Sequence, residues 1–253
     1  MRIINPIFEP GFIYDSYACR IDKGTLNAVR RLEGFWRKES KNYTQKIYFL
    51  KADIRKYFDS IDHEVLVAII KKKISCAKTI WLIKKILKRQ PTNCKGIKVE
   101  EGKGLPIGNL TSQLFANIYL NEFDEFLKHK LRAKFYIRYV DDFIIATKDR
   151  GYLVSLIEPI ENFLKEHLRL DLHPVKRKIF YSRSGIDFLG YFIKPYYKII
   201  RFGNIKRFLR RINRYKKAGK WQEKKEQSLA AWMGYAGQGN SYNLLRDIRP
   251  RLS

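Results

Sequence analysis

Residues 135–146, with the sequence FYIRYVDDFIIA, contain two short apolar segments, 135–139 and 143–146, on either side of a polar tip. Their β-branched and aromatic residues predict the two strands of a hairpin. Asp141 and Asp142 lie at the tip, where adjacent carboxylates repel each other and lose hydration, a cost that a bound cation relieves. The pattern therefore favours a metal site. Aspartates also close ordinary turns, so the pair alone leaves that alternative open.

A second carboxylate follows another buried segment. Residues 47–50, Ile-Tyr-Phe-Leu, predict a strand, and Asp53 lies where this strand leaves the core. If the strand lies beside the hairpin in one sheet, Asp53, Asp141 and Asp142 converge. Three such carboxylates are hard oxygen ligands suited to Mg²⁺ or Mn²⁺, which keep waters and substrate phosphates in their other positions. Two ions of this kind activate a 3′-hydroxyl and stabilise a pyrophosphate leaving group in an in-line displacement.

Two further aspartates, Asp59 and Asp62, are weaker candidates for that site. Apolar residues follow Asp62 at helical spacing up to Ile74, so Asp62 is predicted to be the N-cap of a helix.

The net charge of the chain indicates which kind of molecule it binds. The chain has 253 residues, 45% of them hydrophobic, which is enough for one large domain or two closely joined ones. Lys and Arg number 52 against 25 acidic residues, for a formal charge of +27. This imbalance predicts an anionic polymer as partner, with nucleic acid ahead of a membrane surface.

Other classes are disfavoured by the sequence. No apolar run approaches the length of a membrane span or of a secretory leader, so a cytoplasmic location is expected. The three cysteines are widely separated without a Cys-x-x-Cys pair, and the four histidines lack metal-ligand spacing. Neither a disulfide framework nor a zinc site is indicated.

The order of predicted elements is strand, helix, helix, strand, strand, helix, strand. This order favours an α+β domain with helices on one face of an antiparallel sheet. Residues 1–40 are predicted to be turn-rich, with glycines separating short apolar pieces, and a long helix is predicted from Thr111 to His129. Strands at 186–193 and 199–202 are predicted to form a second hairpin.

The composition changes after Phe202. Basic residues alternate there with apolar ones at a spacing that gives a helix with an apolar stripe and a broad cationic face. Contact with a nucleic-acid backbone is favoured over a merely solvated face because the whole chain is basic. The basic residues expected to contact nucleic acid are Lys206, Arg207, Arg210, Arg211 and Arg214.

A glycine-rich stretch occupies residues 102–108, GKGLPIG. It lacks the Gly-Lys-Ser/Thr ending of a P-loop, and its glycine spacing does not fit a dinucleotide fold. It predicts a tight turn that approaches a ligand closely and ends at a helix N-terminus, where free N–H groups favour anions.

Taken together, the motifs resemble those of reverse transcriptases, in the same order along the chain. They are Asp53 with Phe58, Gly108-x-x-x-Ser112-Gln113, Tyr139-x-Asp141-Asp142, His173-Pro174-Val175-Lys176 and Phe188-Leu189-Gly190. The chain is most similar to prokaryotic members of the group II intron-related branch. Residues 107–113, IGNLTSQ, resemble the version found in diversity-generating retroelements, chiefly through Ile107 and Gln113.

The resemblance implies a role for each matching position. Asp53, Asp141 and Asp142 would hold two Mg²⁺ ions, with Mn²⁺ as a substitute and the Ile54 carbonyl assisting. Lys176 would give a proton to pyrophosphate or neutralise phosphate. Substrate would be bound by Phe58, the gate against ribonucleotides, and by Ile107, Gly108, Gln113 and Tyr139. Phe188, Leu189 and Gly190 would form the primer grip; for Phe58, an ordinary core phenylalanine is the alternative.

The resemblance also implies a right-hand polymerase fold. Residues 1–45 would be partial fingers, 46–202 the palm and 203–253 a helical basic thumb. The partners would be template RNA, a cDNA or primer strand, deoxynucleoside triphosphates and an accessory protein of the retroelement, with no membrane. Relatives carry a further fingers segment before residues 7–10, which this chain is expected to lack.

Three hypotheses follow. The first is an RNA-directed DNA polymerase that copies an RNA template into cDNA with errors at template adenines. The second is a group II intron maturase-type or other bacterial reverse transcriptase. The third, of another class, is a catalytically impaired RNA-binding module without N-terminal fingers; retention of all three aspartates argues against it.

Overall fold

The structure, a computed structural model, describes residues 3–88, 99–106, 109–219 and 221–248. The chain divides into two compact units, Met1–Phe180 and Tyr181–Ser253. No helix within the described ranges is both long and apolar enough to cross a bilayer.

The first unit is built on a four-stranded sheet with the order β2-β3-β1-β4. Its strands are β1 (Tyr48–Asp53), β2 (Phe135–Tyr139), β3 (Asp142–Thr147) and β4 (Lys178–Tyr181). Strand β3 pairs antiparallel with β2 on one side and with β1 on the other. The predicted hairpin is therefore confirmed, and the strand that ends at Asp53 does lie beside it.

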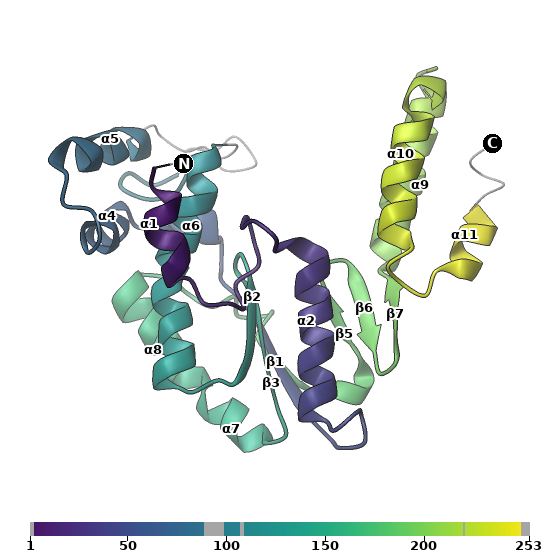
Figure 1. Ribbon diagram of the computed structural model, residues 1–253, viewed down its shortest axis with the longest axis horizontal. Coiled ribbons are helices and arrows are strands. Elements are labelled where there is room, and N and C mark those ends of the chain that lie inside the picture. Colours follow the sequence, from purple (N-terminus) through teal and green to yellow (C-terminus); the bar gives the residue numbers. More distant parts are fainter. Residues whose placement is uncertain (1–2, 89–98, 107–108, 220, 249–253) are drawn as a thin grey trace. The chain divides into compact units, whose positions relative to one another are not determined.

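Helices cover both faces of this sheet (Figure 1). On one face lie α6 (Leu110–Glu125), α7 (Arg150–Ser155) and α8 (Ile157–Leu168). The Phe123 ring of α6 packs 5.2 Å from the ring of Phe143 in β3. These helices confirm the predicted α+β architecture.

The opposite face is covered by α2 (Gly24–Glu39), so the expectation that helices lie on one face only is wrong. Its Phe35 ring lies 5.3 Å from Phe135, and its Trp36 ring lies 5.1 Å from Phe49. The prediction that residues 1–40 are turn-rich is thus wrong for this segment, because buried residues recur at helical spacing through it.

Shorter helices complete the unit. They are α1 (Asn5–Phe8), the 3₁₀-helix η1 (Glu9–Gly11), α3 (Tyr57–Ser60), α4 (His63–Lys71), α5 (Ala77–Leu87) and the π-helix η2 (Phe126–Lys130). Asp62 caps α4 as predicted, because its carboxylate accepts hydrogen bonds from the N–H groups of Glu64 (2.9 Å) and Val65 (3.1 Å). η2 directly prolongs α6, so the predicted helix over 111–129 is confirmed.

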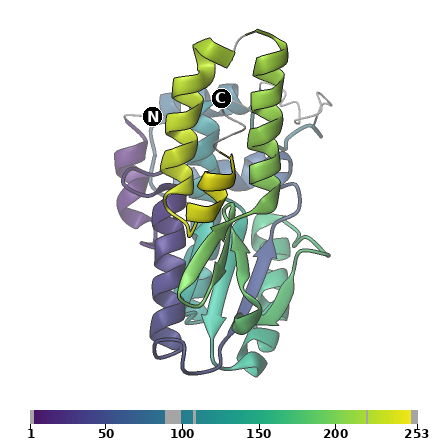
Figure 2. The same cartoon turned by 90° about the vertical axis from the view of Figure 1, so that its right-hand side faces the viewer.

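The second unit combines a small sheet with helices (Figure 2). It contains η3 (Ser182–Ser184), β5 (Ile186–Phe188), β6 (Tyr191–Lys194), β7 (Tyr197–Ile200), α9 (Phe202–Lys217), α10 (Trp221–Ala236) and α11 (Tyr242–Ile248). The strands follow the antiparallel order β5-β6-β7. Helices α9 and α10 pack through the rings of Phe208 and Trp232, which stack with centroids 4.1 Å apart.

The single strand predicted over 186–193 is wrong, because a turn at Leu189 and Gly190 divides it into β5 and β6. The basic helix predicted after Phe202 is confirmed as α9.

Candidate active site

The register of the first sheet places the candidate aspartates next to one another. Asp53 ends β1 and is the cross-strand partner of Asp142, which begins β3. Asp141 lies in the two-residue turn between β2 and β3, and its carbonyl accepts a 3.3 Å hydrogen bond from the N–H of Ile54. The Asp53 carbonyl accepts one of 2.7 Å from the N–H of His173. Backbone hydrogen bonds therefore place the Cα atoms of the three aspartates close together at one edge of the sheet.

The aspartate carboxylates at this edge of the sheet repel one another. Burial and the neighbouring Asp53 carboxylate raise the pKa of Asp141 to about 7. Lys176 pairs with Asp53, which raises the pKa of the lysine. Lys51 lies 3.3 Å from the Asp142 carboxylate. Lysine ammonium groups therefore offset the negative charge of two of the three aspartates.

These residues fit a divalent cation by their donor chemistry. Within the described ranges, no three acidic, histidine or cysteine side chains have the arrangement of metal ligands. Asp53 and Asp142 are each paired with a lysine. Burial, and after it the Asp53 charge, raise the pKa of Asp141, and a divalent cation bound there would offset both costs. Carboxylates are the oxygen donors that Mg²⁺ prefers.

A buried ion pair supports the turn that carries Asp141. The Arg138 guanidinium, 1% exposed, donates to both carboxylate oxygens of Asp124 at 2.7 and 2.6 Å. It also donates to the Ser16 hydroxyl at 3.0 Å and to the Val140 carbonyl at 2.8 Å. Sequence reasoning missed Arg138, although an arginine within an apolar strand signals a buried partner.

The predicted substrate residues are placed as follows. The Tyr139 hydroxyl lies 3.2 Å from the Thr25 hydroxyl of α2. Phe58 is half-buried in α3, and its carbonyl accepts a 2.9 Å hydrogen bond from the N–H of Leu105. Gln113 is exposed in the first turn of α6. The two remaining positions, Ile107 and Gly108, lie outside the described residues.

The predicted primer grip forms a tight turn in the second unit. Leu189 and Gly190 both have positive φ, 48° and 91°, as a type I′ hairpin turn requires. The Gly190 carbonyl accepts a 2.8 Å hydrogen bond from the Tyr235 hydroxyl. A Cβ atom at position 190 would lie 2.5 Å from the Asn204 amide nitrogen and 2.6 Å from the Tyr235 oxygen. Only glycine therefore fits this turn without movement of its neighbours.

The cationic face predicted after Phe202 is present on α9. Its buried residues, Phe208 and Ile212, face the rest of the second unit, so the basic side chains are left in solvent. The five basic residues predicted to contact nucleic acid are all exposed: Lys206, Arg207, Arg210, Arg211 and Arg214.

Comparison with known proteins gives consistent matches. Residues 1–193 match the family model described as reverse transcriptase (RNA-dependent DNA polymerase). Protein YkfC of Escherichia coli (strain K12) is 26% identical over 76% of this chain and 58% of its own length. The group II intron-encoded protein LtrA of Lactococcus lactis subsp. cremoris is 27% identical over 81% of this chain and 43% of its own length. The chain thus spans about half the length of these relatives.

Among solved structures, apo telomerase from Candida tropicalis, truncated from its C-terminal domain, matches with a TM-score of 0.57. The match covers 76% of this chain and 42% of that one at 18% identity, which shows a shared fold. The family model covers most of the sequence, and the fold agrees with it. This chain belongs to the reverse transcriptase (RNA-dependent DNA polymerase) family.

Proposed function

We propose that this chain is an RNA-directed DNA polymerase that joins deoxynucleotides by two-metal-ion nucleotidyl transfer. The observation that carries the proposal is the pairing of Asp53 with Asp142 across β1 and β3, with Asp141 in the turn directly before Asp142. Membership of the reverse transcriptase family supports it independently.

Asp53, Asp141 and Asp142 would hold the ions, with the Ile54 carbonyl as a further oxygen donor. When bound, two Mg²⁺ ions, or Mn²⁺ in their place, supply Lewis-acid activation of a 3′-hydroxyl and neutralise charge on pyrophosphate. The protein's own contribution is to hold these oxygens at one edge of a rigid sheet, so that their geometry is set before substrate arrives.

Lys176 has a separate role in the proposed mechanism. Its side chain is 58% exposed while paired with Asp53, so it can turn toward solvent without unpacking the core. Pairing raises the pKa of Lys176, so the amine is protonated at neutral pH. With a cation held by Asp53, the Lys176 ammonium group would be free to neutralise the triphosphate or to give its proton to departing pyrophosphate.

Selection of substrate is assigned to the residues around the turn before α6. The half-buried ring of Phe58 would lie under the sugar and exclude a 2′-hydroxyl, and Tyr139 would contact the nucleotide beside it. Gln113, with Ile107 and Gly108, would contact the templating base pair. In the diversity-generating retroelement subgroup, looser contact there would give errors at template adenines.

Template and primer would lie against the basic second unit. The Phe188–Gly190 turn would hold the primer end, and the cationic face of α9 would contact the phosphate backbone. Residues 1–45, 46–202 and 203–253 would act as partial fingers, palm and thumb. The proposed partners are template RNA, primer or cDNA, deoxynucleoside triphosphates and a retroelement accessory protein.

Primer extension tests this function. A DNA primer annealed to a mixed-sequence RNA template, with Mg²⁺, is expected to be extended by the wild-type chain but not by Asp141→Asn. Asp59→Asn, which makes the same charge change in α3, should extend normally. Absence of incorporation by the wild-type chain would favour an RNA-binding module instead.

The similarity to LtrA favours a second candidate, a group II intron maturase-type reverse transcriptase. Sequencing of the extension products separates the two. Excess errors opposite template adenines support the diversity-generating subgroup, whereas uniform accuracy over all four template bases supports the maturase-type enzyme.

A further inference from the structure

Helix α5 presents an exposed aromatic residue that its own packing does not explain. Ile80, Ile83 and Leu87 are buried against the core of the first unit. Trp81 is 61% exposed and Leu82 is 51% exposed. The other tryptophans, Trp36, Trp221 and Trp232, are at most 6% exposed. The amphipathic pattern of α5 is thus satisfied without Trp81, which leaves a large ring in solvent.

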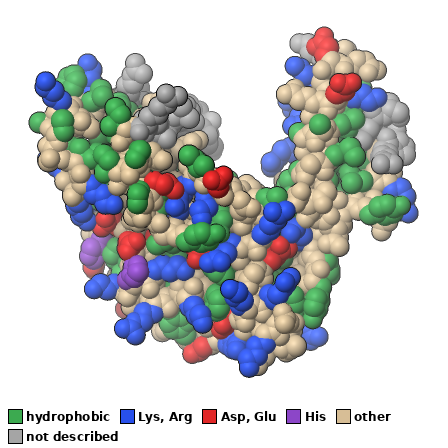
Figure 3. All heavy atoms as spheres, viewed as in Figure 1, with side chains coloured by type: hydrophobic (Ala, Val, Ile, Leu, Met, Phe, Trp, Pro, Cys, Tyr) green, Lys and Arg blue, Asp and Glu red, His purple; other side chains and the backbone are tan. Residues whose placement is uncertain are grey.

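The surroundings of Trp81 are strongly cationic. Residues 71–88 include seven lysines and no acidic residue. Lys78, Lys84 and Lys85 of α5 are all exposed, and the Lys85 ammonium lies 5.0 Å from the Trp81 ring. In the space-filling view, basic and hydrophobic side chains adjoin over α4 and α5 (Figure 3). We call Lys71, Lys78, Trp81, Leu82, Lys84 and Lys85 the α5 surface.

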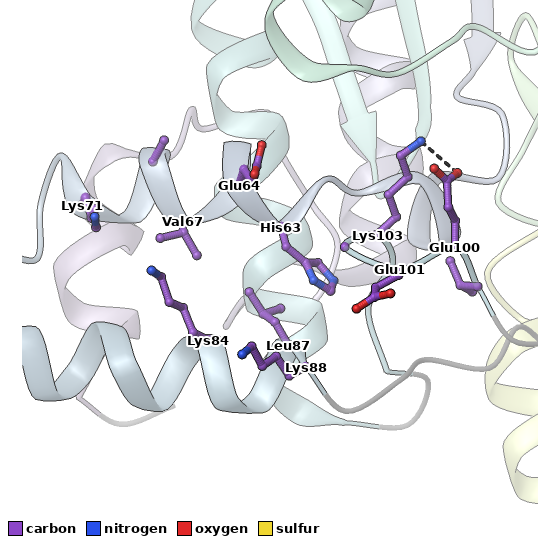
Figure 4. A pocket seen from close by; sticks show the side chains of 13 residues that line it. His63, Glu64, Val67, Lys71, Lys84, Leu87, Lys88, Glu100, Glu101 and Lys103 are labelled. Carbon is purple, nitrogen blue, oxygen red and sulfur yellow. Dashed lines mark hydrogen bonds and ion pairs between the residues drawn. The ribbon is translucent and has the colours of Figure 1, made fainter.

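The α5 surface is hollowed beside the indole ring. A cavity of about 480 Å³ lies between the end of α4 and the start of α5, and Trp81, Lys71 and Lys84 contribute to its lining. A second cavity, of about 680 Å³, lies between the same helices, where side chains such as Val67, Lys84 and Leu87 face one another (Figure 4). Lys71 and Lys84 line both cavities, whereas Glu64, Glu100 and Glu101 line only the larger one, so the smaller cavity beside Trp81 is the more cationic of the two.

We propose that the α5 surface binds single-stranded RNA outside the active site. An unpaired base would stack on Trp81, and its neighbouring phosphates would contact Lys78, Lys84 and Lys85. An aromatic ring flanked by lysines, in a segment (71–88) without an acidic residue, suits a chain of bases and phosphates. An acidic protein segment would gain the charge contacts, but only a nucleic acid carries a stacking base beside every anionic group.

This surface is distinct from the proposed active site. Helix α5 carries none of the aspartates, and none of its residues belongs to the substrate positions named above. Binding there would hold part of a long template on the first unit while another part is copied, so loss of the surface would weaken RNA binding without changing the chemistry.

Trp81 provides its own reporter, because it is the exposed tryptophan of the chain. The full-length protein is first saturated with a short RNA–DNA template–primer duplex, which occupies the proposed active site. Oligouridylate is then added while tryptophan fluorescence is followed. Quenching is expected in the wild-type chain. In Trp81→Phe the quenching should vanish while RNA affinity, measured by anisotropy of labelled oligouridylate, stays within about twofold, since phenylalanine also stacks.

Two further variants separate stacking from charge. Trp81→Ala should bind oligouridylate about tenfold more weakly, because it removes one stacked base. The triple variant Lys78→Gln, Lys84→Gln and Lys85→Gln should lower the slope of log affinity against log salt by about two. A matched control, Lys130→Gln, Lys148→Gln and Lys165→Gln, removes three exposed lysines elsewhere in the first unit and should leave the slope unchanged.

Several outcomes would overturn the proposal. They are unchanged fluorescence on addition of RNA, quenching that persists in Trp81→Phe, or wild-type affinity in Trp81→Ala. Stronger quenching by polyglutamate than by RNA would assign the surface to an acidic protein. Extension of the short template–primer by Trp81→Ala should match the wild type, so this test and the test of polymerase activity fail independently of each other.

Discussion

The buried guanidinium of Arg138 donates a 2.8 Å hydrogen bond to the carbonyl of Val140, the first residue of the turn that carries Asp141. Val140 has a φ of 57°, which a β-branched residue rarely adopts and which costs on the order of 1–3 kcal/mol. Asp124 fixes the guanidinium in turn through two hydrogen bonds. The buried pair therefore holds the strained turn and, with it, the position of the Asp141 carboxylate.

Replacement of Arg138 should reduce both stability and activity. Arg138→Met leaves the Asp124 carboxylate buried without its cation and should lower the free energy of unfolding by about 3–5 kcal/mol. Urea denaturation measures this change.

The double variant Arg138→Met with Asp124→Asn separates folding from positioning. It removes the unpaired charge and keeps an acceptor for the Tyr136 hydroxyl, so much of the stability should return. The Val140 carbonyl still lacks its donor, so kcat for primer extension should stay at least about tenfold low, with KM for template–primer little changed. Full recovery of kcat would show that Arg138 has only a structural role.

Removal of Lys176 should strengthen cation binding while it weakens catalysis. Lys176→Met frees Asp53 from its ammonium partner, and because this pair is partly exposed the gain should be modest, up to about fivefold in Mn²⁺ affinity. Isothermal titration calorimetry measures the affinity, and primer extension should slow in parallel. Lys178→Met, which removes an exposed lysine two residues away, should change neither quantity.

The raised pKa of Asp141 predicts a pH-dependent stability of the metal-free chain. Its pKa is about 7 in the folded state against an ordinary value of 3.8, so the folded state binds more protons between these values. The Asp141 contribution to stability should therefore fall as pH rises from about 4 to about 7. Asp141→Asn cannot titrate, so urea denaturation in EDTA should show a smaller decline over this range. An equal decline in both proteins would assign it to other groups.

The turn at Gly190 should not tolerate a side chain. Gly190→Ala places a methyl group against the Asn204 amide and the Tyr235 hydroxyl at a positive φ, and should destabilise the second unit by about 1–3 kcal/mol. Tyr235→Phe alone should cost about 1 kcal/mol through its lost hydrogen bond. Because it also removes one of the two crowded atoms, the double variant should be more stable than the sum of the single effects. Strict additivity, measured by urea denaturation, would exclude the predicted crowding.

Local patterns in the sequence predicted much of the first unit. The alternation of apolar segments around Asp141 and Asp142 specified the hairpin, and Asp62 before a helical apolar pattern specified a capped helix. The place of the Asp53 strand beside the hairpin was assumed rather than predicted, and convergence of the three aspartates followed from that assumption. The roles of these residues in binding metal and substrate stay predictions.

Long-range features were not predictable in the same way. Arg138 lies in a strand and its partner Asp124 lies in a helix. The local sequence around one residue does not indicate that the other is its partner. Helix α2 was not predicted because it contains Gly34, and glycine usually weakens a helix. In the structure a Cβ at this position would meet open space, so packing does not require the glycine. The turn between β5 and β6 was not predicted because it contains Leu189, and leucine rarely takes the positive φ found there.

Titration of Mn²⁺ by electron paramagnetic resonance tests most directly whether the two strands build one metal site. Asp53 on β1 and Asp141 on the hairpin should each be needed, so Asp53→Asn and Asp141→Asn should both weaken Mn²⁺ binding by at least about tenfold. Asp59→Asn should bind as the wild-type chain does. Wild-type Mn²⁺ affinity in Asp53→Asn would contradict the account.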